Sequence, residues 1–243
     1  MQTKITTIKK NFQKSFEKYN SNAIIQKQVA EQLSDCIKNH HYNEVLEIGC
    51  GTGFLTKQLK NKITFNKYCA NDLIEKSEIH IKNIIRDTEF YCGDFREINF
   101  NKKFDLIASN AVFQWFENIE EVFEYCKHIL NKNGTLIFST FSPNNFREIR
   151  ELCGLSLSYK TADELNFLLE KNFNIEYIEQ SEYIINFDNP LKIIEHMKNT
   201  GVNSLSEQIW SVKKIKEFCK EYSKNYPDLP LTYSPIIVVA KLK

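Results

Sequence analysis

Three of the seven glycines in this chain of 243 residues lie within five positions, at Gly49, Gly51 and Gly53. Glycine adopts positive φ without strain and has no Cβ to hold a ligand away from the backbone. Residues 45–48 before this loop are typical of a buried strand, and residues 54–59 after it are typical of a helix. A strand, a glycine turn and a helix N-terminus in this order indicate a nucleotide-type binding site.

Strand and helix patterns alternate on both sides of this loop. Ser21 is suited to cap a helix over residues 21–36. Beyond the loop we expect the following elements: strands at 67–72, 89–92, 104–109 and 135–141, and helices at 75–85 and 119–130. This alternation predicts an α/β fold with a doubly wound, mostly parallel sheet.

The last third of the chain has a different pattern. A capping box of Thr161 and Glu164 opens a helix to about residue 171, and a long strand is expected at 175–187. Further helices are expected to start at Asn189-Pro190 and at Ser204, the second running to about residue 223, before a final strand at 236–240. We therefore expect one domain over residues 1–243, divided as follows: an N-terminal helical segment 1–40, a core 41–187, a helical insertion 188–230 and the final strand 231–243.

Composition excludes several classes of protein. The chain is 42% apolar and 26% charged, as in ordinary globular proteins, and no apolar stretch approaches the roughly 18 residues of a membrane span. Seven cysteines without a Cys-x-x-Cys pair argue against a disulfide framework or a zinc site. The N-terminus has no apolar signal-peptide core, so we expect a cytoplasmic protein without a membrane partner.

Polar residues follow the predicted strands at the edge where such folds bind ligands. Asp72 follows the second strand, Asp94 the third and Asn110 the fourth. Asp72 lies about 20 residues past the loop, where dinucleotide-binding folds also place a diol-binding carboxylate. Asp94 is also suited to be a helix cap. The spacing Gly-x-Gly-x-Gly favours methyl transfer over hydride transfer, because the dinucleotide fingerprint requires Gly-x-Gly-x-x-Gly.

The motif Glu47-x-Gly49-x-Gly51-x-Gly53 resembles the first motif of the Rossmann-like S-adenosylmethionine-dependent methyltransferases. More narrowly, the chain resembles the malonyl-[acyl-carrier-protein] O-methyltransferases of biotin synthesis over nearly its whole length. The stretches that carry this resemblance are residues 16–19 with Ala23 and Gln26, 104–110 with Gln114 and Trp115, 138–141, and 230–233. The resemblance implies a seven-stranded sheet with an antiparallel last strand and an N-terminal helical lid. It also implies S-adenosylmethionine as cofactor, no metal, and a malonyl-loaded acyl carrier protein as partner.

The resemblance also suggests site residues. Those expected to bind the cofactor are Glu47, Gly49, Gly51, Gly53, Asp72, Leu73, Asp94, Phe95 and Asn110. Those expected to act in catalysis are Tyr19, Gln114 and Trp115, the last two by donating N–H groups to the acceptor carboxylate. Tyr19 and Trp115 are also suited to pack their helices. Those expected to bind substrate or carrier are Gln26, Arg147 and Arg150. The lysines expected to assist carrier binding, or simply to form a solvated helix face, are Lys213, Lys214, Lys216, Lys220 and Lys224.

Methyl transfer to a carboxylate requires no general base, because the acceptor is ionised near neutral pH. The sequence agrees: it has no Gly-x-Ser-x-Gly elbow, and its five histidines lie outside the strand-tip motifs, where we expect surface or packing roles. Two alternatives stay open, a small-molecule carboxyl- or C-methyltransferase and a non-catalytic cofactor-binding protein. A nucleic-acid partner is not expected, because net charge is only +1 and no Asn/Asp-Pro-Pro-Tyr-like motif follows the fourth strand.

Overall fold

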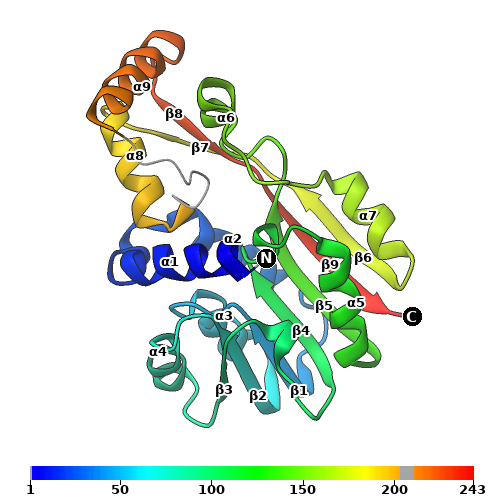
Figure 1. Cartoon of the computed structure of the whole chain (residues 1–243). Coiled ribbons are helices and arrows are strands. Elements are labelled where there is room, and N and C mark those ends of the chain that lie inside the picture. Colours follow the sequence, from blue (N-terminus) through cyan, green and yellow to red (C-terminus); the bar gives the residue numbers. More distant parts are fainter. Residues whose placement is uncertain (1, 203–210) are drawn as a thin grey trace.

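The computed structural model describes residues 2–202 and 211–243 of the chain (Figure 1). It contains these strands: β1 (His41–Ile48), β2 (Thr64–Asp72), β3 (Glu89–Cys92), β4 (Phe104–Asn110), β5 (Leu130–Phe141), β6 (Phe173–Gln180), β7 (Tyr183–Asn186), β8 (Pro230–Tyr233) and β9 (Pro235–Leu242). Its helices are α1 (Gln2–Asn22), α2 (Ile24–Asp35), α3 (Phe54–Lys62), α4 (Ser77–Ile84), α5 (Ile119–Ile129), α6 (Arg147–Cys153), α7 (Ala162–Glu170), α8 (Pro190–Asn199) and α9 (Val212–Asn225). Two short 3₁₀ turns lie at Phe95–Glu97 and Phe113–Trp115.

A seven-stranded sheet forms the centre of the molecule, with strand order β3-β2-β1-β4-β5-β9-β6. Strands β1 to β5 pair in parallel, whereas β9 is antiparallel to both of its neighbours, β5 and β6. The predicted Rossmann-like α/β fold with an antiparallel last strand is therefore confirmed. Strand order reverses between β1 and β4, and this switch point is where folds of this kind bind ligands.

Two hydrophobic layers cover the two faces of the sheet. Alternate residues of β1 separate them, since Val45 packs into one layer and Leu46 into the other. One layer contains buried residues of α2, α3 and α4, and the other contains those of α5 and α7. In Figure 1, α1 (dark blue) lies across the end of the sheet toward which β4 points, with α8 and α9 beyond it. None of the described helices has both the length and the apolar character needed to cross a bilayer.

The structure corrects the predicted helix start at Ser21. The Ser21 hydroxyl donates to the Lys18 carbonyl inside α1, and the break between α1 and α2 falls at Ala23. Other start signals are confirmed: Thr161 and Glu164 form a capping box on α7, and the Asn189 side chain caps α8. The predicted helix start at Ser204 lies outside the described residues, and α9 begins after a Ser211 cap.

The strand predicted at 175–187 is two strands in different sheets. The final strand predicted at 236–240 is confirmed as part of β9, but the final segment 231–243 also contains most of a second strand, β8. β6 ends at Gln180, and β7 pairs antiparallel with β8 in a separate two-stranded sheet. The final segment breaks at Ser234 into β8 and β9. Pro235 begins β9 and has no N–H to donate, which limits a continuous ladder at this point.

Candidate active site

The glycine loop connects β1 to α3 with three residues in the left-handed region: φ is 68° at Gly49, 53° at Gly51 and 88° at Gly53. A Cβ at Gly49 would lie 2.3 Å from a Val112 methyl carbon, so the loop packs against the residues after β4 only as glycine. A Cβ at Gly51 would meet nothing within 4 Å. The loop therefore has one packed side, at Gly49, and one open side, at Gly51.

Two buried carboxylates flank this loop. Asp72 Oδ2 accepts the Gly51 backbone N–H at 2.7 Å, and Asp72 Oδ1 accepts the N–H of Ile74 at 2.7 Å. Glu47 Oε2 accepts from the Thr56 hydroxyl at 2.6 Å and from the Tyr68 hydroxyl. Neither carboxylate forms an ion pair with another described residue.

Burial without a cation changes the acidity of both groups. Burial raises the pKa of Glu47 to about 7, against the opposing effect of its hydrogen bonds to Thr56 and Tyr68. Burial also raises the pKa of Asp72 from its ordinary value. A ligand with a positive charge would compensate this loss of solvation. The pair therefore fits a cationic ligand.

The tips of β3 and β4 are already engaged within the protein. Asp94 caps the following 3₁₀ turn and forms a two-pronged ion pair with Arg96, whose Nη2 lies 2.7 Å from Asp94 Oδ2. Phe95 is buried and stacks against Phe113. Asn110 donates to the Gln26 carbonyl at 3.0 Å and so ties β4 to α2.

A cavity of about 160 Å³ lies at this edge of the sheet. It is lined by these expected site residues: Tyr19, Glu47, Gly49, Gly51, Asp72, Leu73, Asp94, Phe95, Asn110 and Trp115. Gly53 is not part of the lining and instead packs beside Ile84, which a Cβ would meet at 2.4 Å. We call this cavity the donor pocket.

Sequence reasoning identified Tyr19 in α1 as a site residue and Phe12 and Phe16 only as packing residues of the same helix, and it missed Ile5, Ile8 and Lys9. All of these residues line the donor pocket. Their spacing follows one face of a helix, a signal that is also typical of simple core packing. Tyr19 stacks on Phe54, directly after the glycine loop, with ring centroids 5.9 Å apart.

A second, smaller cavity of about 20 Å³ adjoins the first, and we call it the acceptor chamber. Phe12, Tyr19, Ala111 and Trp115 line both cavities. The other residues that line the acceptor chamber are Gln26, Gln114, Phe141, Asn145, Phe146, Leu157, Tyr159, Thr200, Val202 and Tyr233. The structure thus brings Gln26 and Gln114 together in the lining that also contains Tyr19 and Trp115, outside the donor pocket.

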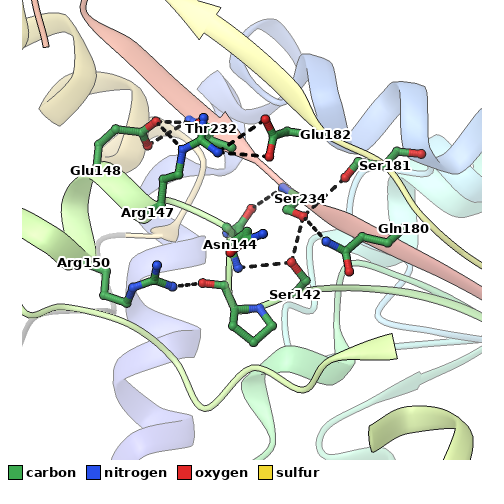
Figure 2. A network of polar contacts seen from close by, with 12 residues as sticks. Ser142, Asn144, Arg147, Glu148, Arg150, Gln180, Ser181, Glu182, Thr232 and Ser234 are labelled. Carbon is green, nitrogen blue, oxygen red and sulfur yellow. Dashed lines mark hydrogen bonds and ion pairs between the residues drawn. The ribbon is translucent and has the colours of Figure 1, made fainter. Parts of the chain in front are cut away.

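Arg147 and Arg150 line neither cavity. Figure 2 shows both guanidinium groups engaged within the protein: Arg147 pairs with Glu182 at 3.2 Å, and Arg150 donates to the Pro143 carbonyl. Their expected role toward a carrier remains a prediction. Among the residues that the structure describes, no cluster of three or more His, Cys, Asp or Glu side chains is arranged to hold a metal ion.

The doubly wound sheet with a glycine-loop pocket at its switch point defines a Rossmann-like methyltransferase, and a methyltransferase domain family matches residues 46–138. The solved N-methyltransferase NodS of Bradyrhizobium japonicum, in complex with S-adenosyl-L-homocysteine, shares this fold. Its TM-score is 0.56 at 11% identity, with 94% of this chain and 98% of that chain covered.

Curated relatives define the family more narrowly. The chain is 33% identical to the malonyl-[acyl-carrier protein] O-methyltransferase of Bacteroides thetaiotaomicron, with 98% of both chains covered. It is 35% identical to the enzyme of the same name from Calditerrivibrio nitroreducens, with 98% of this chain and 97% of the relative covered. The chain therefore belongs to the malonyl-[acyl-carrier protein] O-methyltransferase family.

Proposed function

We propose that this protein transfers a methyl group from S-adenosylmethionine to the free carboxylate of a malonyl thioester carried by an acyl carrier protein. The observation that carries this proposal is near full-length membership of one family. The site supports it, because a pocket with two buried carboxylates that form no ion pair among the described residues adjoins a small chamber whose described lining is uncharged. The first suits a cation and the second suits a small acceptor group.

The described residues fit the donor. Glu47 would face its positive charges, Asp72 would accept from its ribose hydroxyls, and the open side at Gly51 admits a close approach to the backbone. Phe95 belongs to the lining where a base would pack. When bound, this cofactor supplies a methyl carbon that forms a bond to a carboxylate oxygen as its bond to sulfur breaks, the electron pair remaining on sulfur. No proton moves in that step, so the residues of the site need only bind, orient and exclude water.

Water exclusion falls to α1. Its apolar side chains line the donor pocket, and the Thr52 hydroxyl in the glycine loop donates to Asn20 near the end of α1. Opposite charges on donor and acceptor disappear during the reaction, and water stabilises them before it, so a drier site favours transfer. This supports a lid role for α1.

For the carrier, we propose docking on α9, in the cytoplasm. Its exposed lysines are Lys213, Lys214, Lys216, Lys220 and Lys224. A basic helix surface suits an acidic partner or a phosphate on its prosthetic arm. Arg147 and Arg150 lie on α6, which contacts α9, and would contribute only if they left their present partners.

The test is transfer of a labelled methyl group to malonyl-loaded carrier protein, with the acetyl-loaded carrier as control. We expect label on the malonyl form alone, because only it presents a carboxylate. Equal turnover on free short dicarboxylates would instead identify a small-molecule enzyme. Binding of the donor without turnover on any acyl carrier would identify a binding protein.

A further inference from the structure

The described lining of the acceptor chamber carries no formal charge. No Asp, Glu, Lys or Arg is among the described residues that line it, and its volume of about 20 Å³ suits a group of only a few atoms. Tyr19 and Trp115 separate it from the donor pocket and belong to both linings. A small acceptor group placed here would lie next to the donor.

Two buried amide oxygens in this chamber have no hydrogen-bond partner among the described residues, Gln26 Oε1 and Gln114 Oε1. The Gln114 orientation is fixed, because its nitrogen donates at 2.7 Å to the Ala111 carbonyl, which can only accept. Gln26 is only 4% exposed. Buried polar groups are nearly always paired, so these two acceptors indicate a place for a hydrogen-bond donor such as water or an amide N–H. A carboxylate only accepts, so its donor must come from another side chain of the chamber.

The direction of the hydrogen bond to Tyr159 can be fixed from the backbone. The Ser234 N–H, which can only donate, lies 3.1 Å from Asn145 Oδ1 and sets the orientation of the amide. Asn145 Nδ2 must then donate to the Tyr159 oxygen, at 3.1 Å. Because Tyr159 accepts in that bond, its own hydroxyl proton is not used by Asn145.

Asn145 is held firmly in this role. It is 2% exposed, and Ser234 lies in the network of Figure 2, where its hydroxyl accepts from Ser142 at 2.7 Å and from Gln180. Burial raises the pKa of Tyr159, so the phenol keeps its proton at neutral pH. The Tyr159 hydroxyl is therefore an oriented, neutral donor in the chamber wall.

The Tyr233 side of the wall is neutral as well. His196 Nε2 lies 2.6 Å from the Tyr233 hydroxyl, and burial lowers the pKa of His196 to about 4. Among the described residues of the lining, an anion in this chamber would therefore meet neutral donors and no cation. Such donors orient a carboxylate while leaving more of its charge available for attack than a salt bridge would.

We propose that the Tyr159 hydroxyl donates a hydrogen bond to the carboxylate of the acyl acceptor, and that Asn145 is the positioning residue that directs this donor. The inference rests on the proposed function. It adds two residues, one in the irregular segment after α6 and one in the turn after β5, to those that sequence reasoning identified.

The first test is Tyr159→Phe, with Tyr42→Phe as matched control. This control also removes a tyrosine hydroxyl, one that is hydrogen-bonded to Thr135 at the end of the sheet away from the two cavities. A hydrogen bond to a charged group predicts a rise in KM for malonyl-carrier protein of roughly 10- to 100-fold in Tyr159→Phe. We expect the effect in KM more than in kcat, because the bond weakens as the carboxylate loses its charge. The Kd for S-adenosylhomocysteine should stay unchanged.

The second test is Asn145→Asp, which keeps an acceptor for the Ser234 N–H but reverses the polarity toward Tyr159. Position 145 would then hold a carboxylate that accepts a hydrogen bond from the Tyr159 hydroxyl and turns this donor away from the chamber, so KM should rise as in Tyr159→Phe. The rise in KM relative to wild type should become smaller at lower pH, because a protonated Asp carboxyl can again donate a hydrogen bond to the Tyr159 oxygen. A purely structural role for Asn145 predicts no such recovery.

The outcomes separate this inference from the proposed function. If wild type does not methylate the malonyl carrier, the proposed function fails. If wild type is active and Tyr159→Phe matches it in KM and kcat, the Tyr159 assignment is overturned. Loss of S-adenosylhomocysteine binding in Tyr159→Phe also overturns it, because the residue would then act through the donor pocket or the fold.

Discussion

At the scale of single residues, Glu47 and Asp72 do two things at once. Each holds local structure, since Asp72 fixes the Gly51 N–H and Glu47 takes the Thr56 and Tyr68 hydroxyls. Each also remains without a paired cation in the interior among the described residues. The site is therefore electrostatically incomplete until a positively charged ligand enters.

The first prediction concerns Glu47→Gln, which keeps the shape of the side chain and removes its ionisation. Burial raises the pKa of Glu47 from its ordinary 4.5 to about 7. A carboxyl group whose pKa is raised on folding stabilises the folded state fully at pH values below its pKa in the unfolded chain. This stabilisation is lost as pH rises through its pKa in the folded protein. The free energy of unfolding of ligand-free wild type, relative to the variant, should fall by up to roughly 3 kcal/mol across that window.

Chemical denaturation at stepped pH checks this prediction. The difference between the two proteins is needed, because His196 titrates in the same range with the opposite sign. Its pKa is lowered to about 4, so its contribution to stability is lost as pH falls below its ordinary 6.5. A difference between wild type and Glu47→Gln that does not vary with pH would contradict the account of Glu47.

At the scale of elements, α1 is held over the donor pocket by its contact with the end of α8. Gly201 follows α8 with φ of 76°, and a Cβ there would lie 2.6 Å from the Phe12 ring. Phe12 in turn packs edge-on against Trp115, with centroids 5.5 Å apart. The position of α1 therefore depends on residue 201 having no side chain.

Gly201→Ala should therefore displace α1 and weaken cofactor binding. The matched control is Gly154→Ala, whose φ of 67° carries similar backbone strain but whose Cβ would meet nothing within 4 Å. We expect Gly201→Ala to lose about 1 kcal/mol more stability than the control and to raise the Kd for S-adenosylhomocysteine about fivefold or more. Thermal unfolding measures the stability and calorimetry measures the Kd. Equal stability and equal Kd of the two variants would rule out the contact between Gly201 and Phe12 as the one that positions α1.

The helix α9 gives the next prediction. Replacement of Lys213, Lys216 and Lys220 by Glu should raise KM for the carrier-bound substrate several-fold and leave kcat and donor affinity unchanged. The reason is that the substitutions weaken only the electrostatic attraction that brings the carrier protein to the enzyme. Lys171→Glu, on an exposed side chain beside α7, is the matched control. Steady-state kinetics at two salt concentrations test this. Equal KM values for the triple variant and the control would show that the carrier does not dock on α9.

The sequence signals that succeeded were local. Glycine at positions 49, 51 and 53 and the capping residue Thr161 act within a few residues, and the structure has the turn and the helix start that they predict. The signals that failed needed the tertiary structure. Ser21 does not cap a helix, because α1 continues to residue 22. The strand predicted at 175–187 divides, because its second half pairs with β8. The Asn145 amide is oriented by the Ser234 N–H, 89 positions away, and no local pattern reveals that contact.

At the scale of the whole molecule, the site is assembled from distant parts of the chain. The glycine loop supplies the donor side, α1 covers it, and the turn after β5 together with β8 supplies the acceptor side. In the proposed function, the two cavities bring a cationic methyl donor to a carboxylate oxygen. A C-methyltransferase would instead join the methyl group to carbon.

The most direct measurement is the chemical fate of the label after methyl transfer to malonyl-carrier protein. Alkali hydrolyses a methyl ester and releases its methyl group as volatile methanol, whereas a methyl group bonded to carbon stays on the non-volatile acid. We predict that all of the transferred label becomes volatile and that the acetyl-loaded carrier takes up none. Label that stays with the acid, or equal labelling of the acetyl carrier, would contradict carboxylate methylation at this site.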